Sequence, residues 1–342
     1  MTEHFWLGIG VILLSGALNG SFPLPMKYAR VWRWENTWLV FALTALLILP
    51  CLLAVGFVPN FVEVYREVPG RVLLYPLLFG FLWGIAQTTF GVGLKALGMA
   101  LAFSVVSGLG ALVGSLLPLL IQDASDLTRP KGLFLLASIP ILLAGLYLYA
   151  RAGREREREQ PAAPATAATA GMSFAAGLAI CVFTGVVGPS WNLGFALSGD
   201  IIRRSLDLGA TPVTSVYAVW PLILCAGFIP NLLYCVYLLV RQRTWRLFIT
   251  QGCARETALG VSMGLLWLAG IVLYGWGATL VGRYGTSVGF AAFVSAQILA
   301  SNALGILAGE WKATSPHTRR LLTAGVAVIV VSVIVLSLGG LF

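Results

Sequence analysis

The stretch Gly80-Phe-Leu-Trp83, followed by Phe90-Gly91-Val-Gly93 and then Gly98, occurs twice in this chain. The second copy, 184 positions later, reads Gly264-Leu-Leu-Trp267, Tyr274-Gly275-Trp-Gly277 and Gly282. Both copies lie in strongly apolar segments. Glycines and aromatic residues repeated in such segments are typical of a duplicated transporter whose two halves surround one path.

Most of the chain is apolar. Of its 342 residues, 58% are hydrophobic and 10% are charged, whereas roughly 25% of the residues of a soluble domain are charged. A helix needs about 20 apolar residues to cross a hydrocarbon core of about 30 Å. Ten segments reach this length: residues 5–25, 38–58, 72–94, 100–121, 132–150, 173–196, 213–240, 257–279, 286–308 and 321–340. The sequence therefore predicts an all-α polytopic membrane protein with ten transmembrane helices.

The longest polar segment, residues 151–172, divides these helices into five plus five. Because each half has an odd number of helices, the second half enters the membrane in the direction opposite to the first. A weaker match supports the duplication: Gly8, Ser15-Gly16 and Ser21-Phe22 recur 169 positions later as Gly177, Thr184-Gly185 and Ser190-Trp191. We therefore expect two inverted five-helix repeats, residues 1–150 and 173–342, joined by a polar cytoplasmic linker. The alternating Arg and Glu residues that end at Glu159 predict a continued helix at the start of this linker, before a tether rich in Pro and Ala.

Positive charge is distributed unevenly between the two predicted sides of the membrane. Fifteen of the 22 Lys and Arg residues follow the first, third, fifth, seventh and ninth segments, and seven lie on the other side. The positive-inside rule then predicts that the fifteen are cytoplasmic and that both termini are outside. The net charge of +9 is explained by this topology. No basic domain that would bind nucleic acid is present in the sequence.

The sequence does not predict an enzyme, a metal site or a cofactor. His4 and His317 lie outside the apolar segments, and the five cysteines have neither CxxC spacing nor nearby histidine pairs. We find no Ser/His/Asp set, no paired intramembrane carboxylates and no glycine loop that would bind phosphate.

Gln87 is the best single candidate for contacting a solute. Trp83, Gln87 and Phe90 are spaced by four and three residues and so lie on one helical face. An amide offers donors and acceptors for the hydroxyls of a sugar or polyol, and an indole can cover its apolar C–H surface. An interhelical hydrogen bond beside a packing tryptophan explains the same pattern equally well.

The other substrate-binding candidates are polar or aromatic residues in the apolar segments. They are Asn19, Asn192, Trp267, Tyr274, Trp276 and Gln297. Asn19 and Asn192 lie near prolines that interrupt helices, and broken helices expose backbone groups to a pathway. Such prolines can equally well only shape the bundle, and aromatic residues near the ends of segments can be interfacial anchors.

No Asp or Glu lies in the middle of a predicted span, although proton-coupled carriers usually need a titratable group there. The coupling or gating candidates therefore lie near the ends: Lys27, Glu35, Lys95 and Glu310. Solvated or snorkelling side chains are the simpler explanation for most of them. Lys95 is the most distinctive, because it is in the short predicted connection 94–98.

Several motifs together resemble the L-rhamnose/proton symporter family of the drug/metabolite transporter superfamily. They are Asn19-Gly-Ser-Phe-Pro-Leu-Pro-Met-Lys27, Trp32-Arg-Trp34-Glu35-Asn-Thr-Trp38, Leu82-Trp83-Gly84-Ile, Leu97-Gly98-Met99 and Gly309-Glu310-Trp311-Lys312. The resemblance implies a ten-helix carrier of the bacterial inner membrane, with periplasmic termini in our topology, that takes up a sugar together with protons. It also implies pathway positions at Lys27, Trp83, Gln87, Tyr274 and Trp276.

We therefore expect alternating-access uptake of L-rhamnose or a related deoxy sugar or polyol, with protons and the lipid bilayer as the other partners. The alternative is an exporter of a metabolite or drug-like solute on the same fold. A membrane-embedded enzyme would need catalytic groups that the apolar segments lack. The oligomeric state is left open by the sequence.

Overall fold

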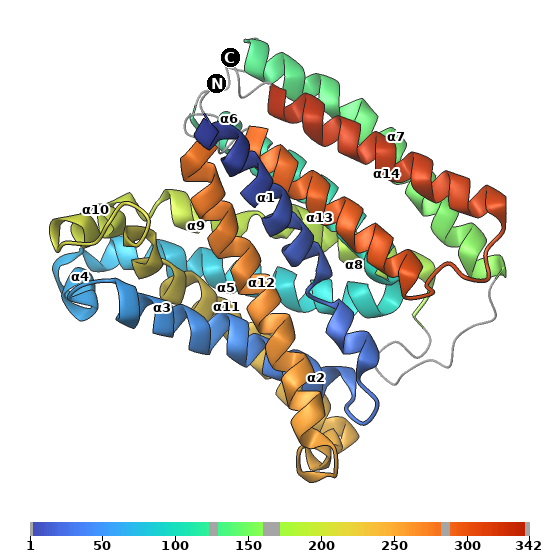
Figure 1. Ribbon diagram of the computed structural model, residues 1–342, viewed down its shortest axis with the longest axis horizontal. Helices are drawn as coiled ribbons and strands as arrows, with labels where there is room; N and C mark the ends of the chain where they lie inside the picture. The colour runs from blue at the N-terminus through green and yellow to red at the C-terminus, as the bar shows by residue number, and fades with distance from the viewer. Residues whose placement is uncertain (1–2, 123–128, 160–171, 282–287, 339–342) are drawn as a thin grey trace. The chain divides into compact units, whose positions relative to one another are not determined.

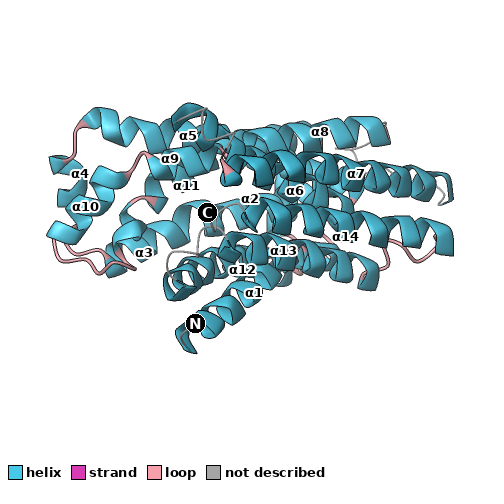
Figure 2. Cartoon of the chain, turned by 90° about the horizontal axis from the view of Figure 1, so that it is seen from above, coloured by secondary structure: helices cyan, strands magenta, loops and turns pink. Residues whose placement is uncertain are grey.

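The computed structural model describes residues 3–122, 129–159, 172–281 and 288–338, and this part of the chain is helical without strands (Figure 2). It divides into two compact units. The first comprises Met1–Ser21, Thr89–Val186 and Ala269–Phe342, and the second comprises Phe22–Thr88 and Val187–Leu268. In each copy of the repeated motif the two units meet inside a helix: at Thr88 and Thr89 in α5 (Gly70–Leu97), and at Leu268 and Ala269 in α12 (Cys253–Val281).

The first unit contains the C-terminal parts of α5 and α12 and six further helices. These are α1 (Glu3–Ser21), α6 (Met99–Gln122), α7 (Pro130–Glu159), α8 (Phe174–Val187), α13 (Val288–Leu307) and α14 (Pro316–Leu338). Within it, α7 and α14 run side by side, and α1 packs along α13 (Figure 1).

The second unit contains the N-terminal parts of α5 and α12 together with shorter elements. These are η1 (Leu24–Tyr28), α2 (Trp34–Ala42), η2 (Leu43–Ile48), α3 (Leu49–Phe57), α4 (Phe61–Glu67), α9 (Ser190–Ala196), α10 (Gly199–Asp207), η4 (Ser215–Ala218), α11 (Trp220–Gln242) and η5 (Thr244–Ile249). The run α2–η2–α3 is one continuous helical segment with a π-helical turn in its middle, and it packs on α11.

Several helices are suited to a bilayer. Seven stretches of the described chain are long and apolar enough to cross one: Phe5–Tyr28, Trp34–Phe57, Gly70–Leu97, Gly132–Arg156, Ser215–Gln242, Cys253–Ala278 and Pro316–Leu336. Shorter apolar helices, Leu101–Gly114, Phe174–Val187 and Ala292–Leu307, lie in the other three predicted segments. Large apolar side chains such as Val55 and Leu233 are exposed, as expected for surfaces that face lipid.

The helix ends follow the sequence signals. α1 ends at Ser21, before Pro23 and Pro25, and α8 ends at Val187, before Pro189. Proline lacks the N–H group that would continue the helical hydrogen bonds, so the predicted interruptions are confirmed. The predicted helical start of the linker is also confirmed, because α7 continues to Glu159. Residues 160–171 of the linker lie outside the described residues.

Glycines bring helices of the first unit into backbone contact. A Cβ atom on Gly16 of α1 would lie 2.3 Å from the Phe293 carbonyl oxygen on α13. A Cβ atom on Gly185 of α8 would lie 3.3 Å from the Val106 carbonyl oxygen on α6. Gly16 and Gly185 correspond through the 169-residue shift of the sequence repeat. The same kind of contact therefore occurs at both copies of the motif.

A second pair of contacts follows the same correspondence. A Cβ atom on Gly277 of α12 would lie 2.7 Å from a side-chain carbon of Ile12 on α1. A Cβ atom on Gly93 of α5 would lie 2.6 Å from the sulfur of Cys181 on α8. Gly93 and Gly277 correspond by the shift of 184, and Ile12 and Cys181 by the shift of 169.

In the second unit the tightest approach joins α5 and α11. A Cβ atom on Gly84 would lie 2.3 Å from the Gly227 carbonyl oxygen, and one on Gly80 would lie 2.3 Å from the Ile223 carbonyl oxygen. Glycine is required at these positions because backbone atoms of the neighbouring helix fill the space of a side chain. Gly309 differs, since its φ of +83° and its open surroundings assign it to a turn.

We predict that Gly84→Ala lowers stability by about 1–3 kcal/mol, because the added methyl group must push two backbones apart. Thermal unfolding of the purified protein in one detergent would measure the change. Gly10→Ala is the matched control, because Gly10 is also helical but no atom lies within 4 Å of the position that its added methyl group would take. Equal melting temperatures for the two variants would contradict the close-packing interpretation.

The end of α7 is fastened to the start of α14 by a carboxylate. Glu159 accepts hydrogen bonds from the backbone N–H and the hydroxyl of Ser315, each at 2.7 Å, and from the Thr318 hydroxyl at 2.8 Å. The Ser315 hydroxyl and then its backbone N–H lower the pKa of Glu159 below its usual value. The charge also lies at a helix N-terminus, where an anion is favoured.

We predict a small acid-sensitive contribution to stability from Glu159. Because its folded-state pKa is lowered, this contribution is complete above the usual carboxyl range and is lost as pH falls through the folded-state value. Thermal unfolding of the wild type and Glu159→Gln across the acid range would therefore give curves that converge at low pH. Glu63→Gln serves as the control, because Glu63 lies in an exposed ion pair with Arg66 on the same helix. A constant difference between wild type and Glu159→Gln would contradict the prediction.

Candidate functional site

Two tryptophans of the repeated motif meet in the second unit. The ring centroids of Trp83 on α5 and Trp267 on α12 lie 5.9 Å apart with an interplanar angle of 33°. Each ring is buried. Trp83 also packs over Gly227, whose missing side chain leaves room for the indole. The repeat therefore forms a pair of indoles, one from each copy of the motif.

Gln87 follows Trp83 by one helical turn and is 7% exposed. Its amide nitrogen is buried and has no hydrogen-bond partner among the described residues. An unpaired buried donor costs about 1–3 kcal/mol, so such donors normally find a water or ligand acceptor. Gln87 can therefore donate a hydrogen bond to a solute oxygen next to the indole of Trp83.

The first unit contains a second group of polar candidates. Gln297 of α13 donates a 2.6 Å hydrogen bond from its amide nitrogen to the side-chain oxygen of Asn19 on α1. The Ser107 hydroxyl on α6 donates to the side-chain oxygen of Gln297 at 3.2 Å. Gly20 permits this arrangement, because a Cβ atom there would lie 2.4 Å from the Gln297 carbonyl oxygen. Asn19, Gln297 and Ser107 thus form one polar chain across three helices.

Aromatic side chains lie next to this polar chain. Tyr274 on α12 packs against Phe293 and Phe290 on α13, with centroid distances of 5.0 and 6.1 Å. Phe293 is one helical turn before Gln297, so the amide and the rings share one face of α13. Tyr274 therefore joins the predicted polar residues Asn19 and Gln297 in the first unit.

The other two aromatic or amide candidates, Trp276 and Asn192, lie on α12 and α9. Trp276 is 44% exposed and lies on the surface of its unit. Asn192 lies on α9, but its side chain is outside the part of the structure that is described.

Glu35 is more deeply buried than its position near a span end suggested. α2 begins at Trp34, so Glu35 is in the first turn of a membrane helix, and it is 1% exposed. Its carboxylate accepts a 2.6 Å hydrogen bond from the Thr244 hydroxyl on η5. Asn36 donates to the Thr244 carbonyl oxygen at 3.0 Å, so two neighbouring side chains of α2 hold Thr244.

Glu256 at the start of α12 is also 1% exposed, but its environment differs. It accepts hydrogen bonds from the backbone N–H groups of Arg30, Val31 and Trp32, and Arg255 lies 3.4 Å away. This carboxylate clamps the loop between η1 and α2. The sequence shows both acids beside apolar segments, but only the folded loops reveal that they are buried.

The remaining charged candidates are less enclosed. Lys27 is exposed on η1. Lys95 lies in the last turn of α5 and not in a connection, because that helix continues to Leu97. The Glu310 carboxylate packs against Gly98, where a Cβ atom would lie 2.9 Å from its oxygen. Gly98 has a φ of +84°, so a larger residue would be strained there as well as crowded.

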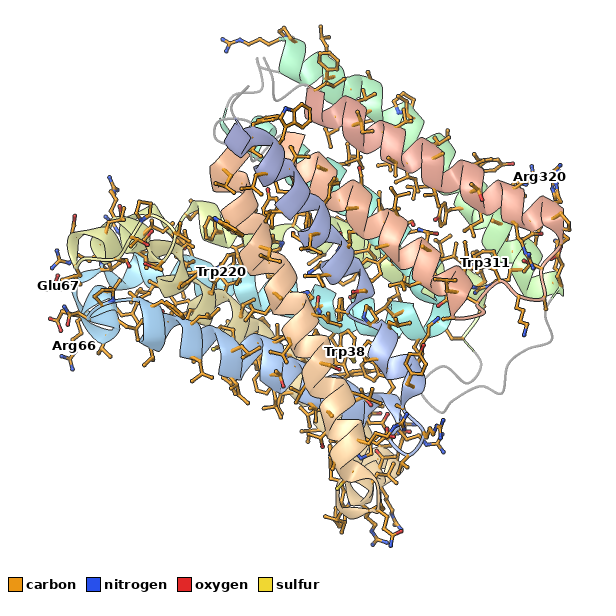
Figure 3. The ribbon with its side chains drawn as sticks, viewed as in Figure 1. Trp38, Arg66, Glu67, Trp220, Trp311 and Arg320 are labelled. Carbon is orange, nitrogen blue, oxygen red and sulfur yellow. The ribbon has the colours of Figure 1, made fainter. Side chains whose placement is uncertain are left out.

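Two further buried polar clusters contain none of the main candidate residues. Asn231, fully buried on α11, accepts from the indole of Trp38 at 2.9 Å and donates to the carbonyl oxygens of Gly84 and Gly227. Trp38 is labelled in Figure 3. Ser104, Tyr149 and Asn302 form a closed ring of hydrogen bonds of 2.6–3.0 Å. In the sequence, these clusters are indicated only by polar residues within apolar segments. These bonds join neighbouring helices within each unit and therefore stabilise helix packing.

Several membrane-spanning helices, with buried amides and indoles between them, define a helical membrane transport protein. Comparison of sequences identifies its family. The chain belongs to the L-rhamnose-proton symport protein (RhaT) family, whose profile matches residues 1–341. This is a family of symport transporters and not of enzymes.

Curated relatives agree over their full length. The chain is 25% identical to the L-rhamnose-proton symporter of Cronobacter sakazakii over 346 aligned positions, which cover 99% of both chains. It is 24% identical to the proteins of the same name from Escherichia coli O1:K1 and Shigella boydii serotype 18, again with 99% of both chains covered.

Proposed function

We propose that this protein takes up L-rhamnose, or a closely related deoxy sugar, together with protons across the bacterial inner membrane. The observation that supports this most strongly is the match to named L-rhamnose-proton symporters across 99% of both chains. A match of this extent includes every helix, so it is not explained by one shared motif. The sequence motifs also support membership of the drug/metabolite transporter superfamily.

We infer an architecture of ten transmembrane helices in two inverted repeats, residues 1–150 and 173–342, with residues 151–172 as a cytoplasmic linker. The paired glycine contacts support this. Gly16 of the first repeat approaches Phe293 of the second, and Gly185 of the second approaches Val106 of the first. An axis that exchanges the repeats would convert one contact into the other. The distribution of Lys and Arg supports periplasmic termini.

The solute contacts are proposed for two groups of residues. Gln87 would donate its unpaired amide hydrogen to a hydroxyl, while Trp83 and Trp267 cover apolar C–H groups. Asn19, Gln297 and Tyr274 would supply a second polar and aromatic surface during the transport cycle. A deoxy sugar suits such residues because it has both hydroxyls and a methyl group. Asn192 and Trp276 are retained as weaker candidates from the sequence.

We predict that reconstituted protein accumulates radiolabelled L-rhamnose only when an inward proton gradient is imposed. A gradient of about one pH unit supports up to about tenfold accumulation for one proton per sugar. Uptake should collapse when a protonophore is added, and empty liposomes provide the background. Uptake that does not depend on the gradient would contradict proton coupling. Proton-driven efflux without uptake would favour the exporter.

We also predict that Gln87→Leu raises the KM for L-rhamnose about 5- to 30-fold, as expected when a hydrogen bond worth about 1–2 kcal/mol is lost. Counterflow in proteoliposomes measures this value. Asn231→Gln is not a suitable control, because it would disturb a buried amide whose hydrogen bonds hold helices together. The control is Thr323→Val, because Thr323 is exposed on α14. An unchanged KM for Gln87→Leu would remove Gln87 from the site.

A further inference from the structure

We propose that Glu35 is the proton-binding group that couples sugar uptake to the proton gradient. This role depends on the proposed proton symport. A coupling residue must bind a proton in one state of the carrier and release it in another, and it must therefore be titratable and shielded from bulk water. Glu35 combines near-complete burial with, in the described part of the chain, a single hydrogen-bond donor, the Thr244 hydroxyl.

The other described carboxylates are poorer choices. Glu256 is equally buried, but three backbone N–H groups and Arg255 hold its charge, so protonation would release the loop before α2. Glu63, Asp200 and Glu155 lie in exposed or partly exposed ion pairs. Glu310 is partly exposed at a turn.

The surroundings of Glu35 permit a change of charge. On α11 the titratable groups within its electrostatic reach are Tyr234 and Cys235. Arg243 and Arg246 are the charged residues close to Thr244 in the sequence, and Arg33 lies two residues before Glu35. All three arginines are exposed. Within the described residues, no ion pair joins any of these arginines to Glu35. Its proton can therefore exchange without the loss of a salt bridge.

The contact that Glu35 makes joins parts of both proposed repeats. α2 belongs to the first repeat, whereas Thr244 begins η5, which follows α11 in the second. While Glu35 is ionised, its bond to Thr244 is charge-assisted and about twice as strong as a neutral one. A proton taken up from the periplasmic side converts the carboxylate into a neutral carboxylic acid and weakens this contact. Release of the same proton to the cytoplasm restores it.

This arrangement links the proton to a structural change. The Glu35–Thr244 bond and the Asn36–Thr244 bond together fasten the start of α2 to η5. A contact whose strength depends on protonation shifts the balance between two conformations by its difference in free energy. In the proposed topology both elements are at the cytoplasmic end, so protonation favours opening toward the cytoplasm.

The test compares two reactions of Glu35→Gln in proteoliposomes. Counterflow of radiolabelled L-rhamnose needs no net proton movement, and we expect it to stay within about twofold of the wild type, because Gln still accepts the Thr244 hydrogen bond. Accumulation driven by a gradient of about one pH unit should fall from up to about tenfold to none. Glu63→Gln, an exposed acid, should retain both reactions.

Accumulation by Glu35→Gln at the wild-type level would overturn the proposal. Loss of counterflow together with accumulation in a variant with wild-type melting behaviour would also overturn it, since that result assigns Glu35 to solute binding or packing. If wild-type protein shows no dependence on the gradient, the proposed symport itself fails, which is a separate outcome.

Thr244→Val provides a second test that does not depend on Glu35→Gln folding. It keeps the carboxylate but removes the hydrogen bond whose strength depends on protonation of Glu35. We therefore expect gradient-driven accumulation to fall while counterflow stays within about twofold of the wild type. Accumulation at the wild-type level would overturn the proposal.

Discussion

Close contact between helix backbones is the constraint on which the structure of each unit depends. Within lipid, burial of apolar side chains gives helices little reason to associate, because the lipid tails are equally apolar. Association then relies on van der Waals contact and interhelical hydrogen bonds, both of which require short distances. Gly84 against Gly227 and Gly16 against Phe293 provide those distances. The buried amide of Asn231 adds bonds to the carbonyl oxygens of Gly84 and Gly227 at the same contact.

Close packing at glycines also limits where specificity can arise. A glycine that contacts a backbone accepts no larger side chain, so these positions are fixed by the fold. Polar side chains can differ only where the helices leave room beside such contacts. Gln87 and Gln297 occupy positions of this kind, one turn from Trp83 and Phe293, respectively. The packing contacts and the proposed solute contacts thus lie on the same helices, close to one another.

The sequence predicts the features that depend on local chemistry. The apolar segments, the helix ends before Pro23 and Pro189 and the extension of α7 all follow from length or from the missing N–H of proline. Which face of a helix is buried does not follow, because a helix that is apolar all round has no distinctive face. Tyr274 and Trp276 illustrate this, because residues two positions apart are separated by about 200° around a helix, and the sequence does not show which of the two faces the rest of the unit.

Burial of the two acids was unpredictable for a different reason. Glu35 is bonded by η5 and Glu256 by the loop before α2, in each case across more than 200 residues of sequence. Such contacts depend on the assembled unit and not on any local pattern. Their contrasting partners are informative nevertheless. Three backbone N–H groups donate to Glu256, whereas within the described residues one hydroxyl donates to Glu35.

Under the proposed duplication, the polar chain of the first unit has no polar counterpart. The position that corresponds to Asn19 by the 169-residue shift is Gly188. The contact of Gly16 with Phe293 corresponds to that of Gly185 with Val106, and the same alignment pairs Gln297 with Gly110. Gln87 likewise corresponds to Ile271 by the shift of 184. The two copies therefore share their packing glycines and differ in their amides. At these amide positions the two halves can offer different partners to a solute with an asymmetric set of hydroxyls, whereas the shared glycines cannot.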